Sequence, residues 1–179
     1  MNLKFVAIII GLVTVAVRLP GVLAPAQYRA CAVKFPRSVL GGRVLMGIVA
    51  LIVWGVMYHA ATDEWKWARP LIVVGVPVAY WLVINFGENF LALRAVAALM
   101  LLIAKQMVDA SDLSDSPWRL VIAVFAYLWV VAAVWLTVAP HQFRDVLGFF
   151  MASDRRCRLA CGGGVVVGLF LVALGLFAY

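Results

Sequence analysis

Charged side chains are scarce in this sequence. Aspartate, glutamate, lysine and arginine make up 13% of the 179 residues, 66% are apolar, and the mean hydropathy is +1.07. This composition excludes a water-soluble core and is typical of a polytopic membrane protein. A linker rich in glycine, serine or charge, which would separate two domains, is also missing. We therefore expect residues 1–179 to form a single membrane domain.

The apolar residues are grouped into runs long enough to cross a bilayer. A spanning helix needs about 20 mostly apolar residues. The sequence offers six such runs, at roughly 3–23, 39–60, 68–86, 88–108, 118–138 and 158–178. It therefore predicts an all-α polytopic membrane protein with about six transmembrane helices.

Residues that would support catalysis or cofactor binding are few. The sequence shows neither a nucleophile beside a general base nor a phosphate-binding glycine loop. His59 and His141 fall on opposite membrane faces of the expected topology, so they cannot share a haem iron. A metal site of Cys31, His141, Cys157 and Cys161 can be drawn, but cysteine commonly serves as a small apolar residue. We expect no enzyme activity, cofactor or metal.

Part of the chain is repeated, which is its most informative feature. Within residues 24–47, eight residues recur unchanged and without a gap 115 positions later. The identical pairs are Ala24/Ala139, Pro25/Pro140, Gln27/Gln142, Arg29/Arg144, Phe35/Phe150, Ser38/Ser153, Arg43/Arg158 and Gly47/Gly162. A third copy is suggested only by Phe86, Leu91 and Arg94, which match Phe35, Leu40 and Arg43 at an offset of 51. We expect helical-hairpin units at roughly 1–60, 67–110 and 118–179, of which the first and last are clear.

The segment between the two helices of each clear unit is not expected to be a loose loop. Pro25 and Pro140 should end the preceding spans, because proline disfavours helix at the residue before it. After each proline, the apolar residues largely share one helical stripe, with basic residues between them. Such segments lie in the plane of the lipid headgroups.

The distribution of charge predicts how the spans are oriented. With six crossings, the side that carries both repeated linkers holds ten basic and three acidic residues, whereas the opposite side holds five of each. Lysine and arginine are retained preferentially in the cytoplasm. We therefore predict that the two termini face the periplasm or exterior.

The repeated linker and the helix that follows it resemble the small two-helix bacterial inner-membrane proteins of the YjeT-like family. The resemblance rests on Pro25 to Arg29 through Arg43 to Gly47, and on Pro140 to Arg144 through Arg158 to Gly162 and the glycines after it. It covers residues 1–60 and 118–179, and this chain departs from it by joining two units around an extra hairpin. The resemblance implies a location in the bacterial inner membrane. The family's function is unknown, so the resemblance implies no activity or ligand.

Arginines near the cytoplasmic helix ends are the strongest candidates for binding. Guanidinium groups can engage phosphate through paired hydrogen bonds, although such arginines also extend to the membrane surface and enforce topology. The candidates for binding anionic lipid or a partner are Arg29, Arg43, Arg94, Arg144 and Arg158. We hypothesise that Arg29, Arg43, Arg144 and Arg158 form cationic pockets under the hairpins.

A polar cluster and two glycine stripes complete the candidate sites. Asn85, Glu88 and Asn89 could form an ion or proton site, or simply satisfy a tight turn. Small residues spaced along a helix let a neighbouring backbone approach closely. The predicted packing residues are Gly47 and Gly55 on one helix and Ala160, Gly164 and Gly168 on another. These stripes would pack the repeats together or receive another subunit.

The leading functional hypothesis is a non-enzymatic membrane scaffold or accessory subunit that contacts anionic lipids, other membrane subunits or further copies of itself, and no nucleic acid. The spans are rich in packing residues and poor in the inward-facing polar groups that proton relays and ion paths need. A small transporter or channel for an anionic solute is the first alternative. A lipid-sensing or lipid-handling protein is the second.

Overall fold

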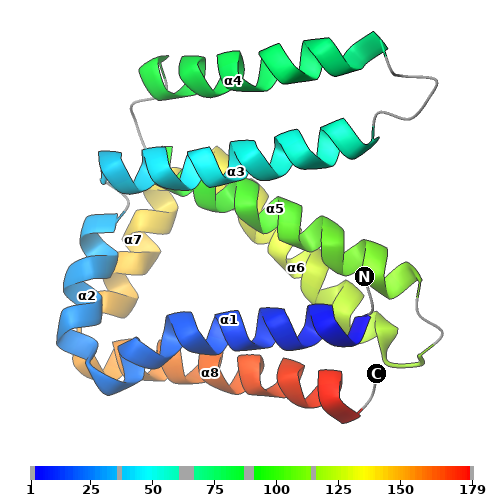
Figure 1. Cartoon of the computed structure of the whole chain (residues 1–179). Helices are drawn as coiled ribbons and strands as arrows, with labels where there is room; N and C mark the ends of the chain where they lie inside the picture. Colours follow the sequence, from blue (N-terminus) through cyan, green and yellow to red (C-terminus); the bar gives the residue numbers. More distant parts are fainter. Residues whose placement is uncertain (1–2, 36–37, 61–66, 87–90, 114–115, 178–179) are drawn as a thin grey trace. The chain divides into compact units, whose positions relative to one another are not determined.

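The chain is an all-α polytopic membrane protein. The computed structural model describes residues 3–35, 38–60, 67–86, 91–113 and 116–177, and within these ranges the regular elements are eight helices (Figure 1). Six of them are long and apolar enough to span a membrane: α1 Leu3–Leu23, α3 Val39–Ala60, α4 Arg69–Phe86, α5 Leu91–Asp112, α6 Arg119–Val138 and α8 Asp154–Phe177. The prediction of six spanning helices in an all-α fold is confirmed.

The two remaining helices are short and follow the proline-containing bends. They are α2 Pro25–Lys34 and α7 Pro140–Met151. Each starts at its proline, where the missing amide hydrogen costs nothing because the first helical amides have no acceptor within the helix. Ala24 and Ala139 separate these helices from α1 and α6. The expected helical linkers are therefore present, and each begins at the predicted residue.

The bends before α2 and α7 are closed by the same backbone hydrogen bonds. The amide of Ala24 donates to the carbonyl of Pro20 over 2.9 Å, and the amide of Ala139 donates to that of Trp135 over 2.9 Å. Serine precedes both following spans, with Ser38 accepting from the amide of Gly42 and Ser153 from that of Cys157. The ends of α1 and α6 and the starts of α3 and α8 consequently lie at positions 115 residues apart.

Two spans differ from their predicted bounds. Helix α5 continues to Asp112 rather than residue 108, and a Lys105–Asp109 ion pair one turn apart supports this extension. Helix α8 starts at Asp154 rather than residue 158. An acidic residue in the first turn is favourable because it faces the positive end of the helix dipole. In both cases the helix extends beyond its apolar run into charged sequence.

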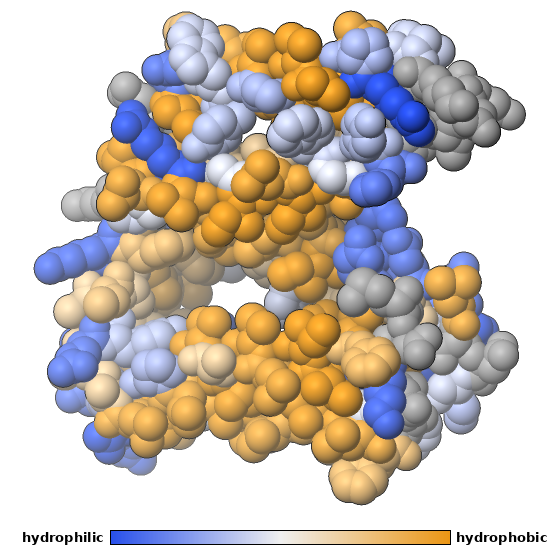
Figure 2. Space-filling view, in the orientation of Figure 1, coloured by the Kyte–Doolittle hydropathy of each residue, from blue (hydrophilic) through white to orange (hydrophobic). Residues whose placement is uncertain are grey.

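The chain divides into two compact units: Met1–Lys34 with Met100–Tyr179, and Phe35–Leu99. In the first unit, α1 lies alongside α8 (Figure 1). Their buried residues form one apolar cluster with residues of α5 and α6. Along these two helices the visible surface is largely apolar, with hydrophilic residues gathered near the helix ends (Figure 2). This distribution suits helices that are surrounded by lipid.

In the second unit, α3 packs against α4. Buried residues are absent from α4 within its described span, and large apolar side chains such as Leu51, Leu71 and Val74 are more than 60% exposed. A soluble protein rarely exposes so much contiguous apolar surface. A bilayer provides the apolar environment that this helix pair lacks within its own unit.

Candidate functional site

The five candidate arginines lie on five different helices. Arg29 belongs to α2, Arg144 to α7 and Arg158 to α8, all in the first unit, while Arg43 on α3 and Arg94 on α5 belong to the second. Arg29 is partly buried, and the other four are exposed. Arg29 is thus placed differently from Arg144, its counterpart in the repeated segment.

The guanidinium of Arg29 bridges α2 to the junction between α7 and α8. Its Nε donates to the carbonyl of Met151, and its Nη2 donates to the carbonyl of Ala152 over 3.2 Å. Its Nη1 forms an ion pair with Asp154, the first residue of α8. Carbonyls at the end of a helix have no partner inside the helix. Arg29 therefore caps the end of α7 and fixes the start of α8 at the same time.

Helices α1 and α8 approach each other through glycine. A Cβ built on Gly168 would lie 2.8 Å from a side-chain carbon of Val15 and 2.9 Å from the carbonyl oxygen of Gly11. A Cβ on Gly164 would lie 2.9 Å from the side chain of Arg18. Contacts shorter than 3.0 Å are essentially never made by real Cβ atoms. Gly168 therefore accepts glycine alone unless the helices separate, because it faces backbone atoms, whereas a side chain at Gly164 requires the side chain of Arg18 to move. Ala160, the third residue of that predicted stripe, is half-buried.

Two of the three cysteines lie in the same interface, close to its cytoplasmic end in the predicted topology. Cys157 and Cys161 are fully buried, and the thiol of Cys161 occupies the space that a side chain on Gly21 would need. The ring of Tyr28 borders this site. Burial raises the pKa of the Tyr28 hydroxyl, and the positive charge of Arg18 partly offsets that effect. Because both thiols are fully buried between α1, α2 and α8, they act as small packing groups.

Cys31 is exposed on α2, apart from the buried pair. A cluster of three or more potential metal ligands is absent from the described residues, so the Cys31, His141, Cys157 and Cys161 site is not assembled there. We predict that native protein in detergent reacts quickly with maleimide at Cys31 alone and reacts at all three cysteines after denaturation. Counting labels by intact-mass spectrometry checks this, and rapid native labelling of Cys157 or Cys161 would contradict the packing described for α1 and α8.

The α3–α4 pair is joined less closely. A Cβ on Gly47 would lie 3.2 Å from the hydroxyl of Tyr80, whereas a Cβ on Gly55 would meet nothing within 4 Å. The Tyr80 hydroxyl donates to the backbone carbonyl of Arg43 over 3.2 Å. Of the predicted stripe on α3, Gly47 lies at the contact with α4, and Gly55 lies away from it. The sequence did not single out Tyr80 as a contact residue.

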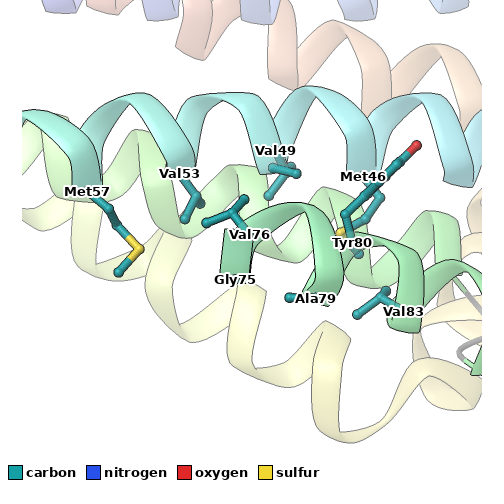
Figure 3. A pocket seen from close by; sticks show the side chains of 10 residues that line it. Met46, Val49, Val53, Met57, Gly75, Val76, Ala79, Tyr80 and Val83 are labelled. Carbon is teal, nitrogen blue, oxygen red and sulfur yellow. The ribbon is translucent and has the colours of Figure 1, made fainter. Parts of the chain in front are cut away.

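An apolar groove of about 300 Å³ runs between these two helices. Figure 3 shows Met57, Val53 and Val49 pointing from α3 toward α4, and the ring of Tyr80 extending from α4 toward α3. A second groove of about 310 Å³ includes Leu51 and Trp54. Ala50, Val76 and Tyr80 line both grooves. The line of contact between α3 and α4, called the α3–α4 seam below, is therefore flanked by two apolar grooves.

The predicted polar cluster is described in part. The side-chain amide of Asn85 donates to the carbonyl of Trp81, one turn earlier in α4, over 2.8 Å. Glu88 and Asn89 lie outside the described residues. Asn85 is exposed and bonded to its own helix. The hypothesis of an ion or proton site at these three residues stays a prediction.

Comparison with known proteins found no matching family model, no similar curated protein and no similar solved structure. The resemblance to YjeT-like proteins stays a prediction.

Proposed function

We propose that this protein is a non-enzymatic scaffold or accessory subunit of a larger complex in the bacterial inner membrane, with α2 and α7 on the cytoplasmic side. The observation that carries this proposal is the bridge from Arg29 to Met151, Ala152 and Asp154. It joins the two interfacial helices and the start of α8 into one platform. A surface that is already ordered before binding avoids the entropic cost of becoming ordered when the partner binds.

The platform presents positive charge around this bridge. Arg144, Arg155, Arg156 and Arg158 are exposed on α7 and α8, and the guanidinium of Arg156 stacks over the ring of Phe149 at 4.4 Å. Exposed arginines on interfacial helices suit anionic lipid headgroups or an acidic surface of a neighbouring subunit. The excess of basic residues on this side of the sequence supports its cytoplasmic orientation.

The interior of the first unit supports a packing role better than transport. One cavity in this unit, of about 180 Å³, lies between α1, α5 and α6. It is lined mainly by apolar residues, and Gln106 contributes a polar side chain. Helices α1 and α8 meet at backbone distance. Ion and solute pathways generally need several inward-facing polar or ionisable groups. The proposal therefore ranks above the alternative of an anion transporter.

The proposal predicts a stable complex in native membrane. Affinity-tagged protein extracted in a gentle detergent should recover a larger membrane protein in stoichiometric amount, identified by mass spectrometry. Reversing charge on the platform with Arg144→Glu and Arg158→Glu should reduce that recovery about tenfold, because charge complementarity is lost. Arg94→Glu is the matched control on the other unit and should leave recovery unchanged.

Two results would contradict the scaffold role. The first is a protein that purifies only as a homo-oligomer and carries anion flux when reconstituted in liposomes, which would favour the transporter alternative. The second is undiminished recovery of the partner by the double charge-reversed protein, which would exclude the platform as the binding surface.

A further inference from the structure

The seam between α3 and α4 combines two apolar grooves with a basic residue at one end. Successive residues of an α-helix are rotated by about 100°, so residues three, four and seven apart share a face. Met46, Ala50, Val53 and Met57, which line the first groove, follow Arg43 by 3, 7, 10 and 14 residues. Arg43 therefore stands at the head of the helical stripe that forms this groove.

The α3 residues of the second groove also follow Arg43 at helical spacing. Gly47, Leu51 and Trp54 line it, and they follow Arg43 by 4, 8 and 11 residues, on the adjoining side of the helix. Tyr80 lines both grooves and donates its hydroxyl to the Arg43 carbonyl. The end of the seam nearest Arg43 is consequently polar. At the opposite end, the guanidinium of Arg69 on α4 stacks over the ring of Tyr58 on α3 at 5.4 Å, and the grooves between these two ends are apolar.

The dimensions of the first groove fit a hydrocarbon chain. From Met46 to Met57 the helix rises about 16 Å at 1.5 Å per residue, close to one leaflet of a hydrocarbon core about 30 Å thick. The groove holds a volume of about 300 Å³ over that length. An elongated apolar groove of this kind admits a chain of methylene groups.

We propose that the α3–α4 seam binds one anionic diacyl phospholipid, with its phosphate on Arg43 and one acyl chain in each groove. Arg43 is exposed on α3, so its guanidinium can form paired hydrogen bonds with phosphate. The acyl chains gain dispersion contacts with side chains from both helices. This inference rests on the membrane location that the proposed function includes, since the seam meets lipid only when the chain lies in the bilayer.

The test is a lipid titration of delipidated, purified protein followed by native mass spectrometry. The probes are palmitoyl-oleoyl phosphatidylglycerol, phosphatidylcholine with the same chains, and glycerol phosphate as a headgroup without chains. Wild-type protein should bind phosphatidylglycerol with the highest affinity. Arg43→Gln should weaken phosphatidylglycerol binding about tenfold, the loss expected when charge-assisted hydrogen bonds are removed, and should reduce its preference over phosphatidylcholine.

Two glycines provide a matched pair for the grooves. A Cβ on Gly75 or on Gly55 would meet nothing within 4 Å, so leucine should fit at either position without forcing the helices apart. Gly75 lines the first groove, whereas Gly55 lines neither groove. Gly75→Leu should weaken the binding of both phospholipids about threefold or more, because an acyl chain loses its contacts. Gly55→Leu should bind like wild type.

Three results would overturn the proposal. They are unchanged phosphatidylglycerol affinity in Arg43→Gln, equal effects of Gly75→Leu and Gly55→Leu, and glycerol phosphate binding as tightly as the complete lipid. Because the titration uses the isolated chain, it is independent of the pulldown. Arg43-dependent lipid binding in a protein that recovers no larger complex would leave the lipid site standing and reject the scaffold role.

Discussion

Replacing Gly168 with leucine is expected to lower the melting temperature of the detergent-solubilised protein by about 6 to 12 °C. Any side chain at this position starts with a Cβ 2.9 Å from the Gly11 carbonyl oxygen and 3.1 Å from the Val15 backbone nitrogen. Backbone atoms cannot rotate away as a flexible side chain can, so α1 and α8 must separate. Overpacking of this kind costs about 3 kcal/mol, and each kcal/mol lowers the melting temperature by about 2 to 4 °C in a domain of this size.

Gly163→Leu is the matched control for that substitution. Gly163 lies on the same helix, and a Cβ there would meet nothing within 4 Å. Leucine at this position should change the melting temperature by less than about 2 °C, since surface substitutions are usually within about 0.5 kcal/mol. Differential scanning fluorimetry in one detergent measures both variants. Equal melting temperatures for Gly168→Leu and Gly163→Leu would show that the α1–α8 contact does not stabilise the protein.

Helix positions could be predicted because they depend on local sequence. Apolar runs of about 20 residues fix the spans, and Pro25 and Pro140 mark the residues where α2 and α7 begin. The predicted starts at residues 3 and 39 agree with α1 and α3. The C-terminal end of α5 and the start of α8 were less predictable, because charged residues such as Asp109 and Asp154 continue a helix without appearing in a hydropathy pattern.

The pairing of α1 with α8 could not be derived from the repeat. The glycine spacing on α8 predicted a close contact, but it did not identify which helix would fill it. On α1, the partner surface is formed by Gly11, Val15 and Arg18, which do not form a stripe of small residues. Complementarity of this kind depends on the shapes of two surfaces in three dimensions. Periodicity along one helix describes only one of those surfaces.

Equivalent positions in the repeat also differ in chemistry. Arg29 and Arg144 occupy corresponding positions, yet Arg29 bonds to the α7–α8 junction and Arg144 is exposed. The counterpart of Asp154 in the first copy is Val39, which cannot accept a hydrogen bond from a guanidinium through its side chain. Asp154 is present in the second copy and has no acidic counterpart in the first. This difference was the sequence signal that Arg29 and Arg144 are not equivalent.

Replacing Arg29 with methionine is accordingly expected to destabilise the protein by about 2 to 3 kcal/mol, or about 4 to 12 °C in melting temperature. The loss should come mainly from the Met151 and Ala152 carbonyls, whose partner disappears. The ion pair with Asp154 contributes less, because the two side chains are 31% and 56% exposed and exposed pairs are worth about 1 kcal/mol at most. Methionine retains a long apolar side chain, so packing changes little.

Two further variants separate these contributions. Asp154→Asn should cost less than about 1 kcal/mol, and Arg144→Met should be near neutral because Arg144 is exposed. Hydrogen exchange should accelerate at the amides of Ala152 to Asp154 in Arg29→Met and not in Arg144→Met, since removing the guanidinium releases the end of α7. If Arg144→Met melted as low as Arg29→Met, the two arginines would be energetically equivalent and the bridge could not be what fixes the platform. If Asp154→Asn alone reproduced the full loss, the ion pair would hold the junction and the helix-end carbonyls would not.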